Sequence, residues 1–213
     1  MHPDPYRQFA AWYDEAKRSG VPLPDAMTLA TVSSSGQPSA RVVLLKEVVD
    51  AAFVFVTNTQ SHKARDIAHN PRGALLFYWS PLDRQVRIQG SIHPLPSAQA
   101  AALFAARPRD SQIAAHAARQ SHVVSSRQAL DEAFAQCQRN FPDDAPVPMP
   151  ADWGAYGLRP ERFEFWLCQA NRLHDRIVYR SVRDPATPGA GVGGTIAGGS
   201  ILEQGWERSR LAP

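Results

Sequence analysis

Three basic side chains occupy alternate positions in the segment RLHDR, namely Arg172, His174 and Arg176. Because alternate residues of a β-strand point to the same face, we expect the three to line one face of one strand. Like charges placed side by side repel one another unless an anion or a carboxylate compensates them. The spacing therefore favours a functional site that holds an anion over a purely structural run, and His174 can also move a proton there.

A second candidate is the segment TNTQSHK, residues 57–63, which leads from an expected strand into a helix that begins near Ser61. The free amides and the positive dipole end of a helix start attract phosphate, and Lys63 adds a full charge. An ordinary solvated helix start explains the same residues about equally well. The helix start that bears Ser61, His62 and Lys63 is thus a candidate phosphate site.

Two other expected strands carry polar groups that can reach a ligand. ARVVLLK holds Arg41 and Lys46 at its two ends, where strict alternation places them on opposite faces. A joint role then needs a bulge, a bend at the strand end or a subunit boundary. In RQVRIQG, Gln85 and Arg87 share a face and can meet the polar edge of a ring, with a solvated strand edge as the alternative.

The segment ARPRDSQIAAHAARQS, residues 106–121, is rich in guanidinium, hydroxyl and amide groups. Arginine forks suit phosphate or carboxylate, so an anion site is one interpretation, and helix capping by Asp110 and Ser111 is the other. The pattern G-x-G-x-x-G in residues 189–194 lacks the strand before it and the helix after it that a dinucleotide site needs. It predicts a flexible Gly/Pro-rich loop over residues 183–204. The histidines show no metal-ligand spacing, so we expect no metal.

These groups must be positioned by an α+β fold. A helix is expected within residues 1–20, capped by Asp4 and opened by Pro5, and Ser61 caps a second helix that runs to His69. N-caps at Ser97, Asp110 and Ser126 predict a helical middle that ends near residue 140. Strands are expected at residues 26–32, 40–48, 53–57, 73–79, 84–95, 163–168, 175–181 and 206–211. Without regular βαβ alternation, this order favours an antiparallel barrel.

Bulk properties bound the function further. The chain has 213 residues, 44% of them hydrophobic, and a net charge of +3, which suits a single domain over residues 1–213. Its basic residues are scattered, so we expect no nucleic-acid partner. Cys137 and Cys168 are read as packing residues. With no secretion signal and no apolar run of membrane-spanning length, we expect a cytoplasmic protein with no membrane partner.

Taken in order, the blocks ARVVLLK, LLFYWSPLDRQVRI, RPRDSQI, RQS, FEFW and RLHDR resemble the pyridoxamine 5'-phosphate oxidase family of FMN-dependent oxidases. The resemblance covers nearly the whole chain. It implies the FMN-binding split β-barrel with peripheral helices, and a homodimer that holds FMN between its subunits. The implied reaction passes a hydride equivalent from a ring-bearing substrate to the flavin and then to O2, which yields hydrogen peroxide.

The same resemblance assigns residues to the site. The implied FMN shell, to which both subunits contribute, consists of Arg41, Val42, Val43, Leu44, Lys46, Val56, Thr57, His62, Lys63, Gln85, Gln120, Ser121, Trp166 and Arg176. The implied substrate pocket consists of Lys46, Leu103, Arg107, Ser111, Arg172 and His174, of which Arg172 and His174 lie over the substrate ring and are the catalytic candidates.

Departures from the family pattern fall mostly around the substrate. Leu103 replaces a tyrosine that binds substrate phosphate, and the other departures are Val56, His62, His116 and Leu167. A lost hydrogen bond to a charged group costs about 1.5–3 kcal/mol, which weakens phosphate binding about tenfold or more. We therefore expect a divergent member such as a phenazine-biosynthesis oxidase, which acts on reduced phenazine carboxylates. A pyridoxamine/pyridoxine 5'-phosphate oxidase and a non-catalytic flavin-binding protein are the alternatives.

Overall fold

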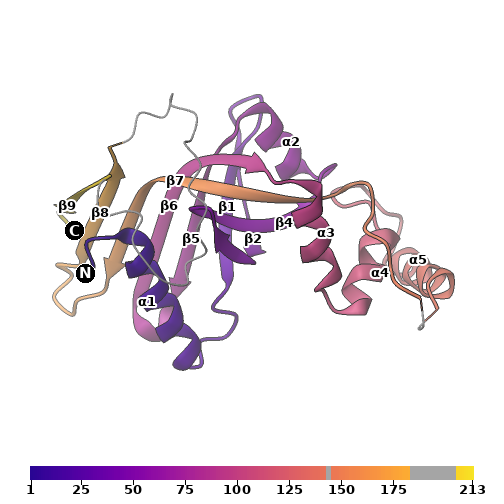
Figure 1. The fold of residues 1–213 in the computed structure, drawn as a ribbon, viewed down its shortest axis with the longest axis horizontal. Helices are drawn as coiled ribbons and strands as arrows, with labels where there is room; N and C mark the ends of the chain where they lie inside the picture. Colours follow the sequence, from indigo (N-terminus) through magenta and orange to yellow (C-terminus); the bar gives the residue numbers. More distant parts are fainter. Residues whose placement is uncertain (143–144, 183–204) are drawn as a thin grey trace.

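The computed structural model describes residues 1–142, 145–182 and 205–213, so the loop expected at residues 183–204 lies outside the described residues. Within these ranges the chain forms one curled antiparallel sheet with helices around it (Figure 1). The strands are β1 Ala26–Val32, β2 Pro38–Leu44, β3 Glu47–Val49, β4 Ala52–Asn58, β5 Arg72–Trp79, β6 Arg84–Pro94, β7 Trp153–Leu167, β8 Asp175–Ser181 and β9 Trp206–Leu211. The helices are α1 Pro5–Arg18, α2 His62–His69, α3 Ser97–Ala105, α4 Arg109–Ala117 and α5 Arg127–Asn140, with a 3-10 turn at Ser80–Leu82.

The sheet curls until its two edges approach each other. Its strand order is β2-β1-β5-β6-β7-β4-β3, and only Leu45 and Lys46 separate β2 from β3 along the chain. The Leu45 amide donates to Asp25 O beside β1 (2.8 Å), and the Lys46 amide donates to Val54 O of β4 (2.8 Å). The single strand predicted over residues 40–48 is therefore wrong, because the chain bends there from one sheet edge to the other. This closure confirms the predicted split barrel.

The longest strand, β7, connects two different regions of the sheet. Its first half pairs with β4, from Asn58↔Trp153 to Phe53↔Leu158, and its second half pairs with β8. The strand that we predicted over residues 163–168 is thus too short, because β7 already begins at Trp153. Opposite the middle of β7, the ladder shifts register at Gly90, where a Cβ would lie 1.9 Å from Arg159 O. Only glycine fits this close approach of two backbones.

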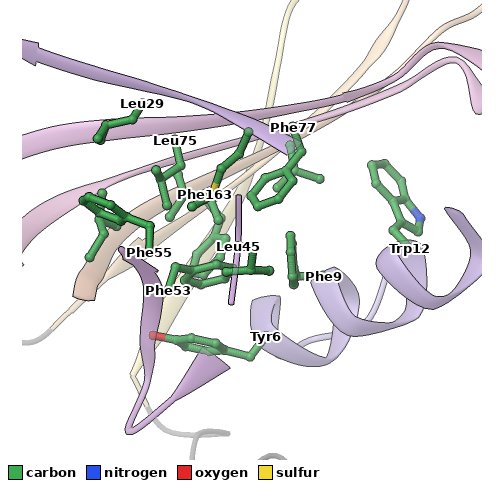
Figure 2. Packing of buried hydrophobic residues seen from close by; sticks show 14 of the residues in the cluster. Tyr6, Phe9, Trp12, Leu29, Leu45, Phe53, Phe55, Leu75, Phe77 and Phe163 are labelled. Atoms are coloured by element: carbon green, nitrogen blue, oxygen red, sulfur yellow. The ribbon is translucent and has the colours of Figure 1, made fainter. Parts of the chain in front are cut away.

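Helix α1 covers the inner face of the sheet. As predicted, Asp4 caps it by accepting from the Tyr6 amide (2.7 Å), and Pro5 is the first helical residue. Phe9 and Trp12 on the buried face of the helix meet the rings of the strands (Figure 2). The centroid of Phe9 lies 4.8 Å from that of Phe53. Buried aromatic side chains each contribute about 1.5–3 kcal/mol, so this cluster is the main core of the barrel.

The outer face of the same sheet is more polar and partly exposed. Along β6, buried Val86 and Ile88 alternate with half-buried Gln85, Arg87 and Gln89, as the predicted wet face requires. Apolar side chains are exposed on this face too. Val42 of β2 is 66% exposed and Tyr78 of β5 is 58% exposed.

Helices α3 to α5 lie at the end of the sheet opposite to β8 and β9 (Figure 1) and enclose a small second cluster. Ser126 caps α5 as predicted, by accepting from the Ala129 amide. The caps predicted at Ser97 and Asp110 are wrong, because Pro96 and Pro108 occupy those positions. Each proline has the extended backbone of a cap, and its carbonyl accepts the first helical hydrogen bonds, so no side-chain cap is used.

Both cysteines are free and half-buried, and Cys137 packs against the second cluster. Among the described residues, no helix combines the length and apolarity needed to cross a membrane.

Candidate active site

One group of predicted site residues gathers where β4 leads into α2. The Lys63 ammonium donates to Thr57 Oγ1 (3.1 Å) and to Gln120 Oε1 (2.8 Å), and Thr57 Oγ1 donates to the same Gln120 oxygen (2.9 Å). The His62 amide donates to Ser121 Oγ (3.3 Å). We call Thr57, Lys63, Gln120 and Ser121 the α2 cluster. Because it joins the turn from β4 into α2 with the loop after α4, residues from two distant sequence blocks meet at one helix start.

The charge of the α2 cluster is not balanced within it. Among the described residues, the Lys63 ammonium donates to neutral oxygens. Burial lowers the pKa of Lys63, and the positive charge of Arg41 lowers it further. Arg41 donates to Thr31 Oγ1 (2.6 Å) and lies 3.9 Å from Asp66 of α2. Burial also lowers the pKa of the Arg41 guanidinium. An anion at the start of α2 would reduce the cost of burying these two charges.

Arg107 forms a second cationic position, between α3 and α4. Its guanidinium lies 4.2 Å from the centroid of the Trp153 ring and also over Phe104. Nη1 of Arg107 is buried and has no hydrogen-bond partner among the described residues, and burial lowers the pKa of the side chain. A buried donor without an acceptor is costly, so an anionic group suits this position. Leu103 of α3 and Ser111 of α4, predicted for the same pocket, are half-buried.

A third group forms a row across the outer face at the β8 end of β7. Gln85, Trp166 and Arg176 are direct neighbours on β6, β7 and β8, so their side chains point to the same side. The His174 ring lies 4.8 Å from that of Trp166. This arrangement brings an indole, an imidazole, an amide and a guanidinium together.

The single strand face predicted for Arg172, His174 and Arg176 is wrong. Only Arg176 belongs to β8, whereas Arg172 and His174 lie in the turn before it. Arg172 has φ 63°, and its amide donates to Gln169 O (3.1 Å), while His174 Nδ1 accepts from the Gln169 amide (3.0 Å). The tight turn removes the strict alternation on which the prediction depended.

Sequence reasoning did not single out Glu164, a carboxylate on β7 that is only 2% exposed. Its Oε1 accepts from Nε (2.9 Å) and Nη2 (2.7 Å) of Arg176, and its Oε2 accepts from Arg162 (2.9 Å). Arg87 lies 3.5 Å from Oε2. The signal was present in FEFW, where Glu164 stands between two buried phenylalanines and must point to the opposite face. We call Trp166, His174, Arg176 and Glu164 the β8 cluster.

The remaining predicted residues lie around these groups. Val42 and Leu44 are exposed on the outer face of β2, and Val43 packs against the core from the inner face. Val56 is half-buried beside Thr57, and Lys46 is exposed at the bend after β2.

The α2 cluster and the β8 cluster are far apart within one chain. Thr57 pairs with Gly154, and Arg176 pairs with Trp166, about 12 residues further along β7. That separation is about 40 Å in an extended strand, so one small ligand cannot reach both clusters of the same chain. A site that uses both clusters needs two chains.

These features define a curled antiparallel barrel with a cation and polar groups at a helix start and exposed apolar side chains on its outer face. Residues 13–140 match the family described as pyridoxamine 5'-phosphate oxidase. Residues 153–213 match the pyridoxine 5'-phosphate oxidase C-terminal dimerisation region. The chain therefore belongs to the pyridoxamine 5'-phosphate oxidase family, which confirms the resemblance and the enzyme class expected from the sequence.

Curated relatives support the family over most of the chain. A protein named pyridoxine/pyridoxamine 5'-phosphate oxidase from Rubrobacter xylanophilus is 50% identical over 83% of this chain and 81% of its own length. Proteins of the same name from Salinibacter ruber and a Janthinobacterium species are 47% and 44% identical, the latter over 99% of this chain and 90% of its own length.

Solved structures share the fold. PhzG from Burkholderia lata, crystallised in complex with tetrahydrophenazine-1-carboxylic acid, superposes with a TM-score of 0.84 at 26% identity and covers 100% of this chain and 94% of its own. An FMN-binding protein from Nostoc punctiforme, related to pyridoxamine 5'-phosphate oxidase, gives a TM-score of 0.71 at 17% identity, with 100% of both chains covered. The second similarity shows the fold alone.

Proposed function

We propose that this protein is a homodimeric FMN-dependent oxidase of pyridoxine or pyridoxamine 5'-phosphate. The observation that carries the proposal is Nη1 of Arg107, which is buried and has no hydrogen-bond partner among the described residues. The rings that this side chain contacts, Trp153 and Phe104, do not belong to the α2 cluster. Two cationic positions suit the two phosphates that such a reaction brings together, one on FMN and one on the substrate. Relatives at 44–50% identity are named pyridoxine/pyridoxamine 5'-phosphate oxidases, which favours a phosphate substrate over the phenazine carboxylate expected from the sequence.

The two groups of site residues suit two parts of FMN, its phosphate and its flavin ring. The α2 cluster offers an ammonium, hydroxyl groups and a helix start to the phosphate, while the row of Gln85, Trp166 and Arg176 offers donors and an aromatic surface to the ring. Because these groups cannot belong to one site in one chain, each FMN would contact the α2 cluster of one subunit and the row of Gln85, Trp166 and Arg176 of the other. The C-terminal dimerisation region supports this arrangement.

FMN would supply the redox step, by accepting a hydride equivalent from a substrate C–H and returning electrons to O2 to give hydrogen peroxide. The protein's part is binding and orientation. Arg107 and Ser111 would hold the substrate phosphate, with Lys46 near the bend as a further cation. Arg172 and His174 would lie over the substrate ring, and the His174 ring is steadied by its contact with Trp166 and by the hydrogen bond to Nδ1.

A second candidate substrate is a reduced phenazine carboxylate. It is favoured by the similarity to PhzG over the whole chain and by the apolar Leu103 at a position where a tyrosine hydroxyl would bind phosphate. Arg107 suits a carboxylate as well as a phosphate, so its charge does not separate the two substrates.

The first test is the flavin itself. The purified protein should be yellow, and heat should release FMN and not FAD. A colourless protein that fails to bind added FMN would refute the proposal. Steady O2 consumption with either substrate class would exclude a non-catalytic flavin-binding protein.

The second test compares turnover of pyridoxine 5'-phosphate with that of a dihydrophenazine carboxylate. We expect a higher kcat/KM for the phosphate, and Leu103→Tyr should improve it further by lowering KM. Leu23→Tyr, at a position 67% exposed before β1, is the control for the added ring. A higher kcat/KM for the phenazine, together with no effect of Leu103→Tyr, would favour the second candidate.

A further inference from the structure

The buried carboxylate of Glu164 has no role in the proposed chemistry, yet it lies at the centre of the charged groups of the outer face. Its direct neighbours across the sheet are Arg87 on β6 and Val178 on β8. With only 2% of its side chain exposed, a carboxylate there is stable only if cations and hydrogen bonds replace its water. Three guanidinium groups do so.

The three arginines are not equivalent. Arg176 gives Glu164 two donors, Nε and Nη2, whereas Arg162 and Arg87 each give one. The Nη1 atom of Arg176 also donates to Ala212 O (3.1 Å). The planar guanidinium of Arg176 is thus fixed from two sides, which leaves its remaining N–H groups pointed in a set direction.

Among the described residues, the charges around Glu164 do not cancel. One carboxylate there faces three guanidinium groups, so the patch keeps a positive surplus beside the row of Gln85, Trp166 and Arg176. Without Glu164, the three guanidiniums would repel one another, and Arg176 would be free to adopt other rotamers.

We propose that Glu164 is a positioning residue for the flavin site: it does not touch FMN, and it holds Arg176 in the orientation in which that side chain contacts the cofactor bound to the partner subunit's α2 cluster. This inference rests on the proposed function, because Arg176 reaches FMN only if FMN binds there. It assigns to the FEFW segment a role beyond core packing.

The test is FMN affinity of the apo-protein, measured by quenching of FMN fluorescence. Glu164→Gln keeps the shape and removes the charge, and we expect the Kd for FMN to rise about tenfold or more. Glu161→Gln is the matched control, because Glu161 lies on the same strand and pairs with Arg72 at a more exposed position. Its Kd should stay within twofold of the unmodified protein.

A double-mutant cycle distinguishes positioning from general structural support. If Glu164 acts through Arg176, Glu164→Gln should add little to the effect of Arg176→Gln on the Kd, and the absorption spectrum of bound flavin should shift in the same way in both single variants. Additive effects on the Kd would overturn the inference.

If Glu164→Gln does not fold, the effect of this substitution on the Kd is measured in the variant Arg162→Met, which has one guanidinium fewer next to residue 164. Arg162→Met with and without Glu164→Gln should still differ about tenfold in the Kd for FMN, and equal values would overturn the inference. Failure of the unmodified protein to bind FMN would instead refute the proposed function.

Discussion

The cations that lie beside the two ends of β7 have opposite kinds of partners. In the α2 cluster, Lys63 donates to the neutral oxygens of Thr57 and Gln120. In the β8 cluster, Arg176 is fixed by the buried carboxylate of Glu164. In the α2 cluster, the positive charge of Lys63 remains available for an incoming anion. In the β8 cluster, Glu164 compensates most of the charge of Arg176 and fixes the orientation of its guanidinium. We infer that one end recognises charge and the other provides orientation.

The strongest test of this comparison is subunit complementation. Lys63→Met disables one end and Arg176→Met disables the other, so each variant alone should retain little FMN after gel filtration. When the two variants are co-expressed, random pairing makes about half of the dimers mixed, and each mixed dimer has one intact site of two. Flavin content should recover to about a quarter of the unmodified value. No recovery would mean that one chain supplies both ends of a site.

Charge recognition at the α2 cluster predicts a difference between two flavins. Lys63→Met should weaken FMN about 10- to 100-fold, because a hydrogen bond to a charged group is lost, and should leave riboflavin, which has no phosphate, nearly unchanged. Titration of the apo-protein with each flavin measures both values. Lys17→Met, on exposed α1 surface, is the control. Equal losses for FMN and riboflavin would place Lys63 outside the phosphate site.

Arg107 should act on the substrate and not on the cofactor. Arg107→Met removes the charge while keeping apolar contact with Trp153, so KM for pyridoxine 5'-phosphate should rise about tenfold, with kcat changed less and the Kd for FMN unchanged. Steady-state kinetics and flavin titration together measure these three quantities. A loss confined to FMN binding would contradict the assignment of two separate anion positions.

The smallest expected effect is a pH dependence of FMN binding. Burial and the charge of Arg41 hold the pKa of Lys63 below the ordinary value of 10.5. Bound phosphate favours the charged ammonium. Above the second pKa of the phosphate, about 6, affinity for FMN should therefore be constant and should then fall a few-fold as pH rises through the lowered pKa of Lys63. Lys63→Arg should remove this decrease, because the guanidinium stays charged. A decrease that persists in Lys63→Arg would have another origin.

Local chemistry explains the features that the sequence predicted correctly. Asp4, Ser61 and Ser126 cap helices because a short polar side chain can satisfy the free amides of a helix start without distant partners. The alternation along β6 likewise predicts its two faces. The predictions failed where the backbone conformation, and not the side chain, decided the structure. Prolines and not polar side chains begin α3 and α4, and a turn replaces the strand expected at Arg172.

The order of chemistry-bearing blocks along the chain was sufficient to identify the family and the barrel, because each block carries its own residue types and spacing. Only the tertiary structure decided which of these blocks meet. Lys63 and Gln120 lie far apart in sequence and share a hydrogen bond, Glu164 compensates arginines from three strands, and the length of β7 separates the two clusters. Such contacts depend on sheet register and curl, which arise from the packing of the whole chain.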